Sequence, residues 1–100
     1  MLQIMFENAR ITMLKALHKQ PSYRLNTSVL KDVVNGYGIT LGRDQIMTNI
    51  SWLERQGLVA TEEIGGGSIT LVTLTGAGQD VAEGTVFIKG VKRPSATGGV

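Results

Sequence analysis

The sequence contains no cysteine, one histidine and two prolines in 100 residues. Without thiols the chain can form neither disulfide bonds nor thiolate-bound zinc or iron–sulfur sites. One histidine cannot supply a histidine cluster, and His18, at the end of a predicted helix, is placed to interact favourably with the helix dipole. We therefore expect no metal and no cofactor. Since no catalytic constellation is present either, we expect a protein that is not an enzyme.

Long hydrophobic runs are also absent. No apolar stretch approaches the roughly 20 residues that a membrane-spanning helix needs. The first residues, MLQIMFENAR, lack the basic region with which a signal peptide begins. A chain without cysteine is compatible with a reducing compartment. These features favour a cytoplasmic protein that has no membrane partner.

Neither sign of charge dominates the chain. Ten basic and eight acidic residues give a net charge of +2, which permits nucleic-acid binding without requiring it. Hydrophobic residues make up 42% of the chain, enough for one core of moderate size in one domain. Oligomerisation would add stability to a domain of this size, and we expect a homodimer.

Apolar residues recur at helical spacing in three segments. They predict a first helix over residues 2–18, a second that begins after Asn26, and a third over residues 43–56. Asn26 is a good N-cap residue, and Gly57 can take the left-handed conformation that ends a helix. Residues 18–26, between the first two helices, are predicted to form a loop.

The first helix has apolar residues on more than one side. Ile4, Ile11 and Leu14 lie off its main stripe, so they belong either to a generous core face or to a second surface such as a dimer contact. Trp52, on one flank of the third helix, is expected to pack against a neighbouring helix or a partner subunit in preference to stacking on nucleic acid. These residues are the candidate dimer contact.

The period of the apolar residues changes to two after the third helix. Residues 58–64 and 68–74 are predicted strands, and a run of glycines between them permits the positive φ angles of a hairpin turn. A phosphate-binding loop is excluded, because such a loop precedes a helix and often carries a lysine. The tip of the predicted hairpin consists of Gly65, Gly66, Gly67 and Ser68.

A short helix, capped by Thr75 and ended by Gly84, completes the pattern. Three helices, two strands and a last helix predict a mainly α (α+β) fold, the winged helix-turn-helix, with a two-stranded β wing in residues 1–84. Residues 85–100 are predicted to be a C-terminal extension that ends in a flexible basic tail. Its cations are Lys89, Lys92 and Arg93.

Part of the chain resembles a large class of regulators. The stretch SWLERQGLVATEE, a glycine turn and then TLTGAGQDVAEG are similar to the helix–wing–helix half of winged-helix transcription regulators of the arsenic-repressor and multiple-antibiotic-resistance types. The resemblance covers about residues 26–84 and implies a winged helix that binds DNA. It does not imply metal sensing, because metal-responsive members use cysteine and histidine ligands.

A closer resemblance spans nearly the whole chain. A small protein family of Mu-like phages and prophages is similar in the elements PSYRLNTSVLKDVV, LGRDQIMTNISWLERQGLV, LTGAGQDVAEG and GVKRP. The resemblance implies a phage or bacterial origin and a winged-helix fold. Members of this family are described as phage proteins or presumed regulators.

The winged-helix resemblance implies where double-stranded DNA would bind. Regulators of this kind place the third helix in the major groove and the wing on the adjacent backbone or minor groove. Outward polar residues of the third helix would meet bases or phosphates, and the start of the second helix offers N–H groups to a phosphate. The candidate DNA-binding residues are Arg24, Asn26, Thr27, Lys31, Arg43, Gln45, Thr48, Ser51 and Arg55.

Acidic residues oppose this interpretation. Asp44 and Glu54 lie near the candidate face, and Glu62 and Glu63 flank a wing tip that has no lysine or arginine. Since affinity for DNA depends on neutralising phosphates, a monomer would bind weakly and a dimer is expected. The alternative is a winged-helix module that binds protein and no DNA, in phage assembly or in takeover of the host.

Overall fold

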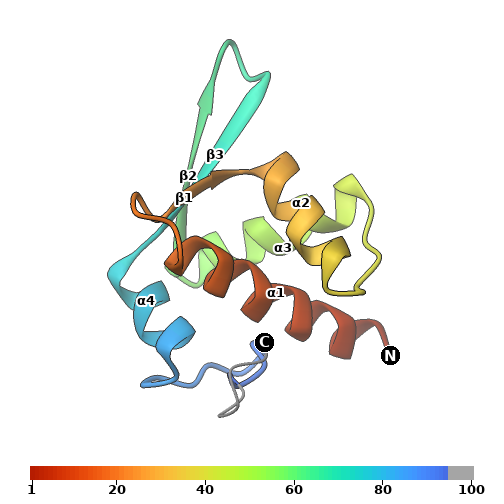
Figure 1. The fold of residues 1–100 in the computed structure, drawn as a ribbon, viewed down its shortest axis with the longest axis vertical. Helices are drawn as coiled ribbons and strands as arrows, with labels where there is room; N and C mark the ends of the chain where they lie inside the picture. Colours follow the sequence, from red (N-terminus) through yellow and green to blue (C-terminus); the bar gives the residue numbers. More distant parts are fainter. Residues whose placement is uncertain (95–100) are drawn as a thin grey trace.

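Residues 1–94, the part of the chain that the computed structural model describes, form an α+β fold of four helices and a three-stranded antiparallel sheet (Figure 1). None of these helices is long and apolar enough to cross a membrane. The elements are α1 (Leu2–His18), β1 (Arg24–Asn26), α2 (Thr27–Gly36), α3 (Arg43–Arg55), β2 (Val59–Ile64), β3 (Ile69–Leu74) and α4 (Gly76–Glu83).

The helices and the hairpin of β2 and β3 confirm the predicted elements, and the capping residues act as expected. The Asn26 side chain accepts a hydrogen bond from the backbone N–H of Val29 at 2.8 Å and so caps α2. The Thr75 hydroxyl accepts one from the N–H of Gly78 at 3.0 Å and caps α4. Gly57 has a φ of +77°, the left-handed conformation that favours glycine where a helix ends.

The sheet has one strand more than predicted. Residues 24–26, predicted as part of a loop, form β1, which pairs with β3 and gives the strand order β1–β3–β2. The prediction of a two-stranded sheet is therefore wrong. A strand of three residues is too short to show an alternating pattern, and it forms because the edge of β3 offers unpaired backbone groups. The element order is still compatible with a winged helix.

The central helix of the core is α1. It contacts α2, α3, α4 and β3, and its residues Ile11 and Leu14 are fully buried. The prediction that these two residues contribute to a dimer contact is therefore wrong, because elements of the same chain cover more than one side of α1. Ile4, in the first turns of the helix, is 62% exposed.

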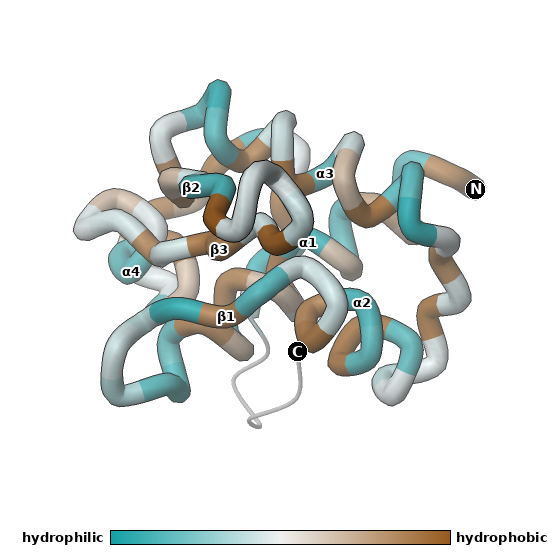
Figure 2. The backbone as a smooth tube through the Cα atoms, turned by 90° about the horizontal axis from the view of Figure 1, so that it is seen from above, coloured by the Kyte–Doolittle hydropathy of each residue, from teal (hydrophilic) through white to brown (hydrophobic). Residues whose placement is uncertain are grey.

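The hairpin, residues 59–74, projects from the helical body along the longest dimension of the molecule, 40 Å against 28 and 22 Å (Figure 1). Its base is bonded to α3: the Glu54 carboxylate accepts hydrogen bonds from the backbone N–H and the hydroxyl of Thr61 at 3.0 and 2.8 Å. In Figure 2, which looks along the hairpin, hydrophobic and hydrophilic residues are interleaved in the strands and helices, as expected where each element buries one face.

The segment after α4 packs on the body over its described length. Val91 is buried, and the backbone N–H of Lys92 donates to the carbonyl oxygen of Glu7 at 3.3 Å. Residues 85–90 return to the body, and the prediction of a flexible tail is wrong for residues 91–94. Residues 95–100 of the predicted tail lie outside the described residues.

Behind α3, on the side of α1, four residues form what we call the Arg10 junction: Arg10, Asn49, Trp52 and Gly90. The Arg10 guanidinium lies 4.0 Å from the centre of the Trp52 ring. Its Nε donates to Oδ1 of Asn49 at 2.8 Å, and its Nη1 donates to the carbonyl oxygen of Gly90 at 2.9 Å. Trp52 thus packs against Arg10 and Gly90 of its own chain, and its ring is half-buried there.

Burial lowers the pKa of Arg10 from its ordinary value, and the charge of Glu7 acts in the opposite direction. The guanidinium nevertheless stays charged at any physiological pH. Its hydrogen bonds and its stacking on Trp52 compensate for the water that burial removes. The Arg10 junction therefore ties α1, α3 and the C-terminal segment together and fixes the position of α3.

Candidate nucleic-acid interface

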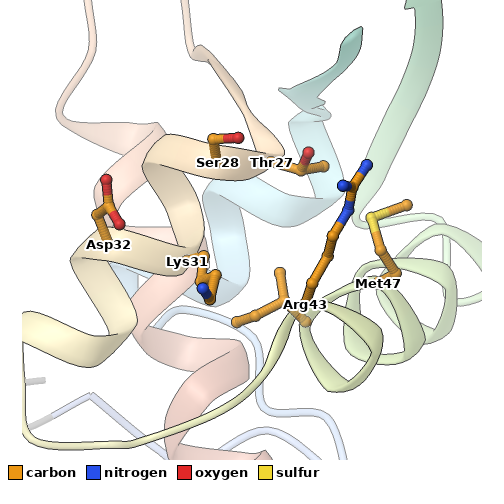
Figure 3. A pocket seen from close by; sticks show the side chains of 7 residues that line it. Thr27, Ser28, Lys31, Asp32, Arg43 and Met47 are labelled. Atoms are coloured by element: carbon orange, nitrogen blue, oxygen red, sulfur yellow. The ribbon is translucent and has the colours of Figure 1, made fainter. Parts of the chain in front are cut away.

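A cleft of about 280 Å³ lies between the N-terminal halves of α2 and α3. Figure 3 shows the side chains that line it from the two helices. Hydroxyl groups and charged groups of both signs surround a small apolar floor. The lining residues are Thr27, Ser28, Lys31 and Asp32 of α2, and Arg43, Ile46 and Met47 of α3.

This cleft continues onto the hairpin. A hollow of about 200 Å³ shares Thr27, Ser28, Arg43 and Met47 with the first one and is closed on its other side by residues 67–70. Asn26 also lines this second hollow. The two hollows form one concave surface between α2, α3 and the hairpin, which we call the polar cleft.

Arg43 lies in both parts of the polar cleft. It is the first residue of α3, and Figure 3 shows its side chain extending toward Thr27 at the start of α2. Within residues 1–94, the side chains of Arg43 and Lys31 make no hydrogen bond and no ion pair. Both cationic groups are therefore available to an anion, although Asp32 on the same wall reduces the net positive charge.

The start of α2 adds hydrogen-bond donors to the same surface. The first N–H groups of a helix have no partner within the helix, and the helix dipole places partial positive charge there. The Asn26 side chain binds one of these groups, the N–H of Val29, while the side chains of Thr27 and Ser28 line the cleft. This combination of donors and nearby cations suits a phosphate group.

Three further candidates, Thr48, Ser51 and Arg55, are exposed on α3 beyond the cleft. At about 100° per residue, Ser51 follows Met47 around the helix, and Thr48 and Arg55 lie farther round, opposite the core. The Thr48 hydroxyl donates to the carbonyl oxygen of Asp44 at 2.9 Å. The outward face of α3 is therefore continuous with the polar cleft.

Two of the predicted residues lie neither in the cleft nor on the outward face of α3. Gln45 lies on the opposite flank of α3, where its Oε1 accepts a hydrogen bond from the N–H of Gly42 at 3.2 Å and helps to cap the helix. Arg24 lies in β1, and its Nε donates to the Thr73 hydroxyl at 3.2 Å. The structure therefore divides the predicted set into a cleft group, an outward group on α3 and these two outliers.

The hairpin tip contributes unequally to the polar cleft. Gly67 and Ser68 line it, whereas Gly65 and Gly66 do not. The Ser68 hydroxyl donates to the carbonyl oxygen of Gly65 at 2.8 Å and holds the turn. Residues 59–74 contain Glu62 and Glu63 and no lysine or arginine, so the hairpin brings negative charge close to a surface that carries cations.

Met47 and Thr70 line the polar cleft but were not predicted as site residues. Met47 stands four residues after Arg43, a spacing that places two side chains on the same face of a helix, so the sequence held a signal for it. Thr70 had no such signal, because its place depends on how the hairpin leans against α2.

No protein-family model matches the chain. A protein of Escherichia phage Mu with the description "Uncharacterized protein gp26" is 41% identical over 91 residues, which cover 91% of this chain and 92% of the phage protein. The chain belongs to the family of this phage Mu protein. An uncharacterised protein of Haemophilus influenzae is 32% identical over 62 residues, which cover 62% of this chain and 60% of the Haemophilus protein. The predicted link to Mu-like phages is thereby confirmed, and neither relative's description states an activity.

Proposed function

We propose that this member of the Mu gp26 family is a winged-helix protein that binds double-stranded DNA and regulates transcription. In this proposal α3 enters the major groove and the hairpin is the wing. The polar cleft carries the proposal, because Arg43 and Lys31 hold cationic groups without a protein partner within residues 1–94, beside the N-terminus of α2. The major groove is about 12 Å wide and admits one helix.

Each group of residues has its own role in this complex. Arg43 contacts a phosphate or a guanine edge, and Thr27 and Ser28 at the start of α2 hold a backbone phosphate. Thr48 and Ser51 on the outward face of α3 approach base edges. Specificity thus depends on the outward face of α3, and most of the affinity depends on the cleft and on Arg55.

A homodimer supplies the affinity that one chain lacks. Each phosphate neutralised by a cation contributes to binding through counterion release, and the acidic hairpin subtracts from this contribution. Two chains double the number of cations and present two α3 helices, which match successive major grooves when they lie about 34 Å apart. The cations of each chain on this surface are Lys31, Arg43 and Arg55.

Fluorescence anisotropy with labelled duplexes from the phage genome tests the proposal at two salt concentrations. We expect Arg43→Ala and Lys31→Ala each to weaken binding several-fold and to lower the slope of log affinity against log salt by about one. Lys19→Ala, which removes the same charge away from the polar cleft, is the matched control and should change little. Absence of binding even at low salt would overturn the proposal.

One observation favours a second candidate, a module that binds protein. The hairpin exposes Glu62 and Glu63 and has no cation between residues 59 and 74, which suits a basic protein surface better than a phosphate backbone. The variant with Glu62→Gln and Glu63→Gln separates the two functions. It binds DNA more tightly if the hairpin lies on DNA, and it binds DNA unchanged if the hairpin serves a protein partner.

A further inference from the structure

A second groove lies between α1 and α2, with β1 at one end, and its volume is about 560 Å³. It shares no lining residue with the polar cleft. Its lining is mostly apolar, with two lysines. The residues are Thr12, Lys15, Ala16, Lys19 and Gln20 from α1 and the following loop, Leu25 of β1, and Val29, Val33, Gly36 and Tyr37 from α2 and its C-cap.

The groove is bounded by one face of each helix. Its α1 wall runs from Thr12 to Lys19 and its α2 wall from Val29 to Tyr37, with members three or four residues apart. Side chains at these spacings form a continuous stripe on a helix. With a rise of about 1.5 Å per residue, each wall is about 10–12 Å long, which matches two turns of a third helix.

Apolar surface in the groove is exposed to solvent. Val29 is 39% exposed and Tyr37 52% exposed, and Leu25 and Val33, which also line the groove, are half-buried. Adjacent large apolar side chains that remain in water mark a surface that a partner covers. At the C-terminal end of the α2 wall, no heavy atom lies within 4 Å of a Cβ built on Gly36, so an incoming side chain has room there.

The charges of the groove define the partner's chemistry. Lys19 is exposed at the end of the α1 wall, and no carboxylate occurs among the described residues that line the groove. A complementary segment therefore carries carboxylates on one side of its apolar stripe. A second copy of this chain is a poorer fit, because the exposed apolar first turn of its own α1 has no acidic residue.

We propose that this groove docks an acidic amphipathic helix of another protein, by the helix-in-groove mode of recognition. Apolar side chains at positions i, i+4 and i+7 of that helix pack on Leu25, Val29 and Val33. Its carboxylates lie beside Lys19. The contact spans two turns of the docked helix.

The docked helix leaves the polar cleft open. At about 100° per residue, Val29, Val33 and Gly36 lie on the opposite side of α2 from Thr27 and Lys31. The groove is therefore a site distinct from the proposed DNA surface, and neither proposal depends on the other. A protein that binds DNA through one side of α2 can hold a partner on the other side.

Fluorescence anisotropy with two synthetic peptides of 16 residues tests the proposal on the full chain. Both peptides carry leucines at helical spacing i, i+4, i+7 and i+11. In one peptide the flanking residues are glutamates, and in the other they are lysines. We expect the glutamate peptide to bind with a dissociation constant on the order of 10–100 µM and the lysine peptide to bind at least tenfold more weakly.

Variants of the chain locate the binding. Gly36→Gln fills the groove without changing charge, and it should not unfold the protein because the space is open and glutamine favours a helix over glycine. We expect it to weaken binding of the glutamate peptide about tenfold. Lys19→Glu should weaken binding by a similar factor, and Lys31→Glu, with the same charge change on the other side of α2, is the matched control.

Each possible outcome decides the proposal. Selective binding of the glutamate peptide that Gly36→Gln and Lys19→Glu weaken, but Lys31→Glu does not, supports it. Equal binding of both peptides, no binding at millimolar concentration, or indifference to Gly36→Gln overturns it. Sedimentation velocity of the free protein tests whether a second copy of the chain occupies the groove. Self-association that Gly36→Gln abolishes would assign the groove to a second copy and overturn the proposal.

Discussion

The two sides of α3 use positive charge in opposite ways. On the inner side, Arg10 is held by Asn49, Trp52 and Gly90 through two hydrogen bonds and a stacked ring. On the outer side, Arg43 makes no hydrogen bond and no ion pair within residues 1–94. One arginine stabilises the fold, and the other is open to a ligand.

The difference between these arginines shows why the number of basic residues predicts binding poorly. A net charge of +2 counts both alike, although Arg10 is occupied by its own chain. The groove between α1 and α2 adds a third case, in which Lys15 and Lys19 border an apolar surface. Position in the fold, and not charge alone, decides which cations can meet a partner.

The largest effect is expected on the inner side, for Arg10→Ala. This change removes two hydrogen bonds and leaves the fully buried Asn49 without its donor, so we expect a loss of about 2–4 kcal/mol in the free energy of unfolding. Urea denaturation measures it. Arg10→Lys keeps the charge without the planar, forked donors and should recover little of the loss. Full recovery would mean that charge alone matters at the junction.

The next largest effect is expected for Gly90→Ala. Gly90 has a φ of +101°, and a Cβ there would lie 2.6 Å from an atom of the Trp52 ring, so the ring or the C-terminal segment must move. We expect a loss of roughly 1–3 kcal/mol and a red shift in the fluorescence of Trp52, the sole tryptophan.

The control for Gly90→Ala is Gly66→Ala at the hairpin tip. Gly66 also has a positive φ, +70°, but its Cβ would meet no heavy atom within 4 Å. Gly66→Ala should lower the free energy of unfolding only by the backbone strain, about 1 kcal/mol, and should leave the fluorescence of Trp52 unchanged. Equal losses at the two glycines would show that the contact with Trp52 contributes nothing.

On the outer side, we expect Arg43→Ala to change the affinity for DNA but not the stability of the fold. Because its side chain is exposed and makes no contact of this kind, we expect the free energy of unfolding to change by less than about 0.5 kcal/mol. The affinity for DNA should nevertheless fall, as proposed above. Thermal denaturation and anisotropy measured on the same preparation check both. A large loss of stability would place Arg43 with Arg10 and remove the contrast between the two sides.

The smallest effect is expected for His18→Gln. Its Nε2 lies 3.0 Å from Oε2 of Glu83, and both side chains are partly exposed, 35% and 46%. A pair of this kind contributes about 0.5 kcal/mol or less. Glu83→Gln should cost the same amount, and the double variant no more than either single one. A double-mutant cycle in urea measures this coupling between the ends of α1 and α4.

Secondary-structure elements were predicted correctly where the residues of the element itself show a periodic pattern or a capping residue. The period of the apolar residues predicted the helices and the hairpin, and Asn26, Thr75 and Gly57 marked their ends. β1 was missed, because three residues show no period. Ile11 and Leu14 were misassigned to a dimer contact, because apolar residues on two sides of a helix do not reveal which neighbours cover them.

The candidate site was predicted only in part. Asn26, Thr27, Lys31 and Arg43 meet in the polar cleft as expected, since two helix starts come together there. Neither Arg10 nor Asn49 stood out, because each looks like an ordinary polar residue on a helix and they are 39 residues apart in the chain. Their bond exists only when α1 and α3 are packed.

The sequence by itself determined the order of the helices and the hairpin, the caps of α2 and α4 and the glycine turn, because periodicity and backbone conformation are properties of neighbouring residues. Only the tertiary structure decided that α1 is buried on several sides, that residues 85–94 close over Trp52, and which cations stay open. These outcomes depend on contacts between segments that are distant in the chain. Bringing such segments together costs conformational entropy, which is offset only when the whole core forms.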